Sequence, residues 1–182
     1  SLGDNAAKIV AAVQQAGLHM QICFVHVPEG VWRTLANTIV CARTAFPNDE
    51  PFLVVRADQL YDWRLLHRVR TQARFEDGIE AFALVDTEPA TLHWASGAHC
   101  TAACKESGRC NALVKVKRNT STRRVASCGH RLVDYDAVTA GDVYVARASI
   151  FALLRDETYE AMYRNTAEAM AKLAARGALG YI

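Results

Sequence analysis

Hydrophobic residues recur along the chain with two different spacings, and segments of the two kinds alternate. Apolar residues three and four positions apart predict helices, whereas alternating or short continuous apolar runs predict strands. The helical spacing occupies residues 6–16, 34–45, 62–75 and 158–176, and a further helix begins at 149–154. The strand spacing occupies residues 19–27, 51–56, 79–85, 112–116, 123–127 and 142–146.

Residues with capping preferences mark several of these boundaries. Asp4 or Asn5 can cap the first helix and Gly17 can end it, Asp62 can cap the third, and Gly177 can end the last. Residues 112–127 alternate around the polar turn NTST, which is typical of a β-hairpin. The order of elements predicts an α/β fold, a three-layer sandwich with a mostly parallel sheet and a β-hairpin insertion.

Residues 51–63, PFLVVRADQLYDW, hold the most informative strand. A short apolar run is followed by Asp58, then by a loop and the next helical pattern. Such a run is too short for a core helix and suits a buried parallel strand. A strand of this kind carries a charged side chain to the carboxyl edge of a sheet, where open α/β folds bind ligands.

Length and charge limit the classes of protein that fit. The 182 residues suit one domain, residues 1–182, with a polar insertion at about 86–111. The formal net charge of +2 gives no overall basic field, so we expect no nucleic-acid partner. No apolar run approaches the ~20 residues that span a bilayer. The first ten residues, SLGDNAAKIV, show no secretory signal, so we expect a cytoplasmic protein.

The six cysteines fall into two groups. Cys23 and Cys41 lie within apolar segments and suit small buried side chains. The other four, with a neighbouring His99, lie in or beside the insertion, and they are Cys100, Cys104, Cys110 and Cys128. Their spacing is usable for a structural Zn²⁺ site, although no C-x2-C pair is present. The sequence does not distinguish a zinc site from disulfides or free thiols in this group of cysteines.

Four segments, in order along the chain, resemble one known family. They are TLANTIVCAR (34–43), PFLVVRADQLYD (51–62), ALVKV (112–116) with CGHRL (128–132), and YDAVTAGDVYV (135–145). Together they resemble the nucleotidyltransferase superfamily of sugar-phosphate and alcohol-phosphate nucleotidyltransferases, most closely the inositol-1-phosphate cytidylyltransferase type. The resemblance implies a Rossmann-like, glycosyltransferase-A-like fold over most of the chain.

The resemblance also implies a metal site and a nucleotide site. In the family the aspartate that ends this strand binds a divalent metal bridging the nucleotide phosphates, which corresponds to Asp58 and Mg²⁺ here. Otherwise Asp58 is a helix or turn cap. The nucleotide contacts of the family correspond to Thr34, Leu35, Ala36 and Asn37. This sequence has Trp32 and Arg33 where the family usually has glycine, and without the family TLANTIVCAR is an amphipathic helix.

Two further positions correspond to the acceptor side of the family's site. Lys115 matches a strand lysine that faces the substrate and could neutralise an attacking phosphate. Because other basic residues surround it on the hairpin, a solvated edge strand is the alternative. Gly141 matches a glycine that lets the substrate approach, and it could equally mark a bulge.

The sequence also departs from the family pattern. It contains no G-x-G-x-R loop with a following Pro-Lys pair, the segment that holds the triphosphate in the family. The family places a second metal-binding aspartate on a later strand, and the sequence ends at Ile182 before that strand. The resemblance therefore implies transfer of a nucleotidyl group, such as CMP from CTP, to a sugar or alcohol phosphate, with pyrophosphate released. The alternative is a catalytically inactive domain with a binding or regulatory role. In either case the chain is expected to be a fragment or a degenerate domain, and a fused or partner membrane enzyme is compatible with it.

Overall fold

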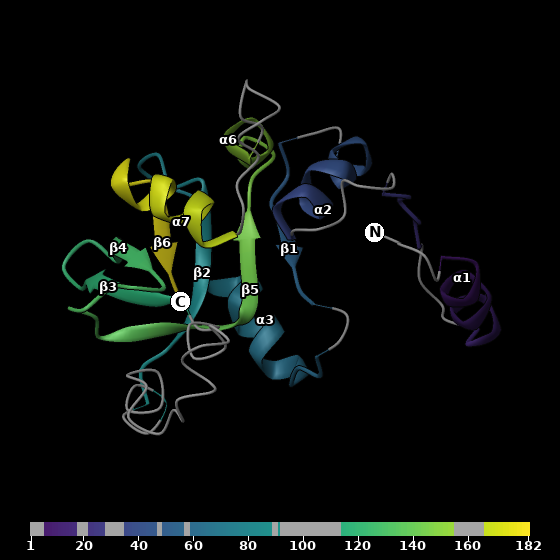
Figure 1. Cartoon of the computed structure of the whole chain (residues 1–182), viewed down its shortest axis with the longest axis horizontal. Coiled ribbons are helices and arrows are strands. Elements are labelled where there is room, and N and C mark those ends of the chain that lie inside the picture. The colour runs from purple at the N-terminus through teal and green to yellow at the C-terminus, as the bar shows by residue number, and fades with distance from the viewer. Residues whose placement is uncertain are drawn as a thin grey trace.

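The computed structural model describes residues 6–17, 22–27, 35–46, 49–56, 59–88, 91, 114–154 and 166–182. Figure 1 shows the arrangement of helices and strands along the chain. The elements are α1 (Ala6–Gln15), α2 (Leu35–Cys41), η1 (Ala42–Ala45), β1 (Phe52–Val54), α3 (Trp63–Gln72), β2 (Ala81–Asp86), β3 (Lys115–Asn119), β4 (Arg124–Gly129), β5 (Ala137–Ala146), α6 (Ile150–Leu154), α7 (Thr166–Ala175) and β6 (Leu179–Tyr181).

The strands form one sheet in the order β1-β5-β2-β6-β4-β3, and β3 also pairs with β5. This additional pairing closes β5, β2, β6, β4 and β3 into a barrel, with β1 attached outside it along β5. Among the described strand pairs, only β2 with β6 is parallel. The sheet is therefore mixed.

The predicted α/β class is confirmed, but the predicted mostly parallel sheet is wrong. β1 and β2 do run in the same direction, as the alternation of helices and strands suggested. However, β5 lies between them and is antiparallel to both. The chain reaches β5 through the β3–β4 hairpin, not through a crossover helix, and this connection reverses the strand direction.

Two groups of buried side chains hold helices on opposite sides of the sheet. On one side α3 contributes Val69, which packs with Leu84 of β2 and with Val143 and Val145 of β5. The helices α2, α6 and α7 contribute to the other, larger group, which includes Ile39, Phe151, Met170 and Leu173. Figure 1 shows α3 separated by the strands from α6 and α7. Helices therefore lie on both sides of the sheet, but the closure of five strands into a barrel differs from the predicted three-layer sandwich.

Three aromatic rings join elements that are distant in sequence. Phe52 of β1 stacks on Phe46, with ring centroids 4.4 Å apart, and on Phe151 of α6, at 5.2 Å. Stacked aromatic pairs of this kind add stability beyond the apolar area they bury. They attach β1 to the side of the sheet that carries α2 and α6.

The helix predicted at residues 62–75 is formed as α3, and it begins at its predicted capping residue. Asp62 caps the helix, accepting a hydrogen bond at 2.8 Å from the backbone N–H of Arg64. Val69 is buried, whereas the arginines of α3 are exposed. The helix at residues 34–45 is also confirmed, as α2 followed by the 3-10 turn η1.

Other predictions need correction. The strand predicted at 19–27 is not formed within residues 22–27, which have only an isolated bridge at His26. A strand is stable only when it pairs with neighbouring strands and buries a face, and here Ile22 and Phe24 remain exposed. β1 is an edge strand of three residues, not a buried parallel one. The predicted amphipathic helix α1 is formed, but it has no buried residue. β6 was not predicted.

Among the described residues, no helix has both the length and the apolar character required to cross a membrane.

Candidate functional site

The strands β1 and β2 end at the same edge of the sheet. Phe52 and Ala81 both lie opposite Ala146 of β5, and Val54 and Ala83 both lie opposite Tyr144. The chain therefore leaves both strands in the same direction and at a similar level. We call this side of the sheet the carboxyl edge.

Each of these two strands leads to an aspartate. Asp86 is the last residue of β2. Asp58 follows the end of β1 by four positions and lies outside the described residues. Ligands of open α/β sheets bind beyond the carboxyl ends of the strands. Asp86 supplies at this edge the kind of carboxylate that Mg²⁺ prefers.

Lys115 lies at the level of Asp86 in the sheet. Val138 of β5 pairs with Asp86 on one side and with Lys115 of β3 on the other. Directly opposite residues project on the same face, and two strand spacings separate these backbones by about 10 Å. The carboxyl edge thus combines an amine and a carboxylate on one face.

The surroundings of Lys115 distinguish it from the next lysine on the strand. Its Nζ lies 4.9 Å from the ring centroid of Tyr135, and within the described part of the chain it forms no ion pair. Lys117 Nζ instead donates to Asp134 Oδ1 at 2.8 Å, and this hydrogen bond raises the pKa of Lys117. Lys115 is therefore the lysine of the pair that is available to an anion.

Asp86 was not among the predicted site residues. It was assigned to the start of the insertion because residues 86–111 have no periodicity. Its signal is the same as that of Asp58, an apolar strand followed by an aspartate. Its Oδ1 accepts a hydrogen bond at 2.8 Å from the backbone N–H of Glu88, which turns the chain away from the strand.

A cavity of about 550 Å³ opens where β2 and β6 end, and we call it the arginine cavity. Its charged lining consists of Arg68 of α3, Arg118 of β3, Arg123 of the hairpin loop, and Asp86. The remaining lining residues are Leu65, Gln72, Leu84, Val85, Thr87, Ala140, Tyr181 and Ile182. Three guanidinium groups and one carboxylate line the cavity, and of the three arginines Arg118 is also paired with Asp136 outside the lining. The remaining excess of positive charge favours an anionic ligand.

Neighbouring groups orient two of these arginines. The Nε of Arg118 donates to Asp136 Oδ1 at 3.2 Å, and its guanidinium lies 5.4 Å from the ring centroid of Tyr181. The Nε of Arg68 donates to Gln72 at 3.3 Å. The fold brings these arginines, which come from α3, β3 and the hairpin loop, together over the ends of β2 and β6.

The predicted nucleotide-binding residues are only partly placed. Thr34 lies outside the described residues, whereas Leu35, Ala36 and Asn37 form the first turn of α2. That helix contacts α6 and α7, on the side of the sheet opposite α3. The structure therefore places the backbone of these three residues, and their contacts with a nucleotide stay a prediction.

Gly141 lies inside β5, where the pairing with β2 is irregular. Ala83 pairs with Tyr144 but Val85 pairs with Thr139, so the register shifts across the segment that contains Gly141. A glycine at such a shift is typical of a β-bulge. This supports the bulge as the reason for Gly141, and its proposed contact with substrate stays a prediction.

Of the cysteines proposed for zinc, only Cys128 is among the described residues. It lies in β4, is a free thiol and packs against the larger core group. Burial raises its pKa to about 12, so the thiol is protonated at neutral pH. Cys100, Cys104 and Cys110 lie outside the described residues, and no group of three metal-ligating side chains occurs within the described ones. The zinc site stays a prediction.

No protein-family model and no curated protein sequence matches this chain significantly. Solved structures of nucleotidyltransferases do match it. The inositol-1-phosphate CTP transferase from T. maritima superimposes with a TM-score of 0.66 at 13% identity, over 98% of this chain and 62% of that one. A CMP:2-keto-3-deoxy-manno-octonic acid synthetase complexed with CTP gives 0.63 at 13% identity, over 96% and 67%.

A UDP-glucose pyrophosphorylase from Acinetobacter baumanii is also similar, with a TM-score of 0.56 at 16% identity, over 96% of this chain and 57% of that one. The chain thus has a mixed α/β fold that matches nucleotidyltransferase structures, as the sequence resemblance implied, although its sheet is not the mostly parallel one that was predicted. It spans about 62% of the length of the inositol-1-phosphate CTP transferase that it resembles.

Proposed function

We propose that this chain is the nucleotide-binding part of a nucleotidyltransferase that acts on a sugar phosphate or an alcohol phosphate. The observation that carries the proposal is the fold match over 98% of the chain with an inositol-1-phosphate CTP transferase. The carboxyl edge supports it, because Asp86 and Lys115 lie there at one level of the sheet beside the arginine cavity.

The reaction would be an in-line displacement at phosphorus. A phosphate oxygen of the acceptor attacks the α-phosphorus of a nucleoside triphosphate such as CTP, and the bond to pyrophosphate breaks. Mg²⁺ bound at this edge would neutralise the phosphates. Asp58 and Asp86 are the carboxylates proposed to hold it, since Mg²⁺ takes one or two carboxylates together with phosphate oxygens.

The basic residues are assigned to the phosphates. Lys115 would hold the phosphate of the acceptor, because its amine forms no ion pair within the described part of the chain. The arginine cavity would hold the remaining phosphate charge, since guanidinium groups bind phosphate oxygens in pairs. In this scheme the chain binds and orients both anions, which is most of what phosphoryl transfer requires of a protein.

Calorimetry with CTP and Mg²⁺ on the intact chain tests the proposal. We expect saturable binding that Asp58→Ala weakens by about tenfold or more, a loss of about 1.4 kcal/mol. Asp49→Ala is the matched control, because it removes an exposed carboxylate that precedes β1 at the other end of the strand. Equal binding by the intact chain and Asp58→Ala removes the proposed role of Asp58.

The acceptor side is tested separately with inositol 1-phosphate and glucose 1-phosphate. Lys115→Ala should weaken the binding of whichever phosphate is the acceptor, whereas Lys117→Ala should not, because Lys117 is already paired with Asp134. Pyrophosphate release with CTP and the acceptor would establish catalysis. Nucleotide binding without release of pyrophosphate would favour the inactive, regulatory domain.

A further inference from the structure

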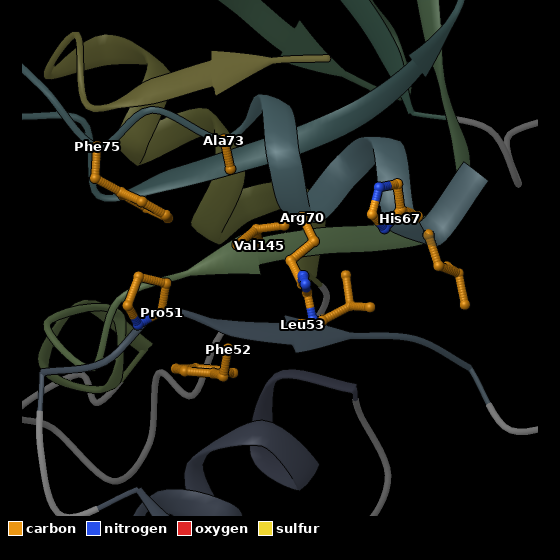
Figure 2. Close-up of a pocket in the computed structure, with 9 residues that line it drawn as sticks. Pro51, Phe52, Leu53, His67, Arg70, Ala73, Phe75 and Val145 are labelled. Atoms are coloured by element: carbon orange, nitrogen blue, oxygen red, sulfur yellow. The ribbon is translucent and has the colours of Figure 1, made fainter. Parts of the chain in front are cut away.

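A second cavity, also of about 550 Å³, lies between α3 and the edge strand β1. We call it the α3–β1 groove, and Figure 2 shows the side chains that line it. Its lining residues are Pro51, Phe52, Leu53, Leu66, His67, Arg70, Ala73, Phe75 and Val145. Most of them are apolar, and two of them, Arg70 and His67, are basic.

The groove is open because α3 covers only part of the sheet. Val69 of the helix packs on β5 and β2, where Val145 and Leu84 are buried. β1 is the edge strand beyond β5, and its Leu53 remains 38% exposed although it lies on the same side as α3. An apolar strip between the helix and the edge of the sheet is therefore accessible to a ligand.

The charge of the groove has one sign. Arg70 and His67 come from neighbouring turns of α3, and no acidic residue lines the cavity. Figure 2 shows Arg70 pointing from α3 toward β1, across the apolar floor. Within the described part of the chain, Arg70 forms no ion pair or hydrogen bond. A guanidinium above an apolar floor is complementary to an anion that carries an apolar body.

The groove is distinct from the arginine cavity. The two cavities share no lining residue, and they lie on opposite flanks of α3. Leu66, Arg70 and Ala73 face the α3–β1 groove, whereas Leu65 and Arg68 face the arginine cavity. A ligand in the groove would therefore leave the carboxyl edge free.

We propose that the α3–β1 groove binds a small amphiphilic anion, with a carboxylate or phosphate head on Arg70 and an apolar body on Leu53, Leu66 and Phe75. The volume of the groove lies within the range of small-molecule sites, and so does its mostly apolar lining with few polar groups. Carboxylate and phosphate share the recognising chemistry, because both accept paired hydrogen bonds from a guanidinium. This site does not depend on the proposed nucleotidyl transfer.

Calorimetric titration with octanoate and octyl phosphate tests the proposal, with octanol and acetate as partial ligands. Both octyl anions should bind more tightly than octanol or acetate, since each of the latter lacks one half of the recognised chemistry. Arg70→Gln should weaken octanoate binding by about tenfold or more, because hydrogen bonds to charged groups are worth that much. The tighter of the two octyl anions identifies the preferred head group.

The matched control is Arg74→Gln, which removes the same charge from an exposed position that follows α3 and does not line the groove. Leu53→Ser should also weaken octanoate binding. Because Leu53 is partly exposed, we expect this variant to fold. Amide chemical shifts should move at Leu53, Leu66 and Ala73 during the titration. No octanoate binding, equal loss in Arg70→Gln and Arg74→Gln, or binding of octanol as tight as octanoate would each overturn the proposal. Displacement of octanoate by CTP would contradict a separate site.

Discussion

At the scale of single residues, Gly180 shows how closely β6 approaches its neighbour. Gly180 pairs with Phe82 of β2 and is buried. A Cβ atom at position 180 would lie well inside van der Waals contact with the Phe82 ring. That ring packs edge-on against Phe75, with centroids 5.2 Å apart, so it has little room to move. Gly180 is thus required by packing and not by its backbone angles.

Gly180→Ala should therefore destabilise the chain by about 1–3 kcal/mol, the usual cost of overpacking a core. Urea denaturation measures the change. Gly129→Ala serves as the control, because a Cβ there would meet nothing within 4 Å. Similar denaturation midpoints for the two variants would show that β6 is not packed against β2 as described.

Burial of Cys128 predicts a pH dependence of stability. Its pKa rises from an ordinary value of 9.0 to about 12 in the folded chain because burial disfavours the thiolate. Between these pH values the unfolded chain loses the proton and the folded chain keeps it. The contribution is therefore intact below about pH 9 and is lost as the pH rises toward 12, by up to about 1.4 kcal/mol per pH unit.

Cys128→Ala should remove this part of the loss of stability at alkaline pH. Urea midpoints of the intact chain and the variant at pH 7 and pH 10 provide the comparison, and the variant should lose less stability between them. Cys23→Ala, at an exposed position, should behave as the intact chain does. Identical alkaline losses in the intact chain and Cys128→Ala would contradict the burial of the thiol.

At the scale of elements, α3 separates the two cavities, so its stability affects both. Asp62 caps the helix through the 2.8 Å hydrogen bond from Arg64 N–H. Asp62→Ala should cost about 1 kcal/mol, and Asp62→Asn should cost much less because asparagine caps equally well. The exposed ion pair between Asp62 and Arg64 adds little. Thermal denaturation of both variants tests this, and equal losses would assign the effect to charge and not to the cap.

The elements also show what the sequence could predict. The position of α3 and its capping residue were predicted, because its apolar spacing and its cap are both local signals. The β3–β4 hairpin was predicted for the same reason. In contrast, β1 is paired with β5 about ninety positions later, and no local pattern specifies that pairing or its direction. β6 has three residues, too few for a periodicity to identify.

The same distinction holds for the candidate site. Lys115 and Asp58 could be proposed because a family resemblance pointed to them, and Asp58 lies outside the described residues. Asp86 could have been found, since it follows an apolar strand as Asp58 does. The arginine cavity could not, because its arginines come from α3, β3 and the hairpin loop. Only the closure of the barrel brings these segments together.

At the scale of the whole molecule, the two cavities lie on the side of the sheet that carries α3, on opposite flanks of this helix. The carboxyl edge and the arginine cavity gather the polar groups suited to phosphates. The α3–β1 groove, on the other flank of α3, is mostly apolar, and its lining includes basic but no acidic side chains. The fold resembles that of nucleotidyltransferases over nearly the whole chain. The proposed function assigns the nucleotide to the carboxyl edge.

The most direct test of the proposed nucleotide site is an NMR titration of the isotope-labelled chain with CTP and Mg²⁺. We expect saturable chemical-shift changes at Asp86, Lys115 and Val138, with the amides of Leu53 and Ala73 in the α3–β1 groove unchanged. Changes confined to the α3–β1 groove, or no change at the carboxyl edge at saturating CTP, would contradict it.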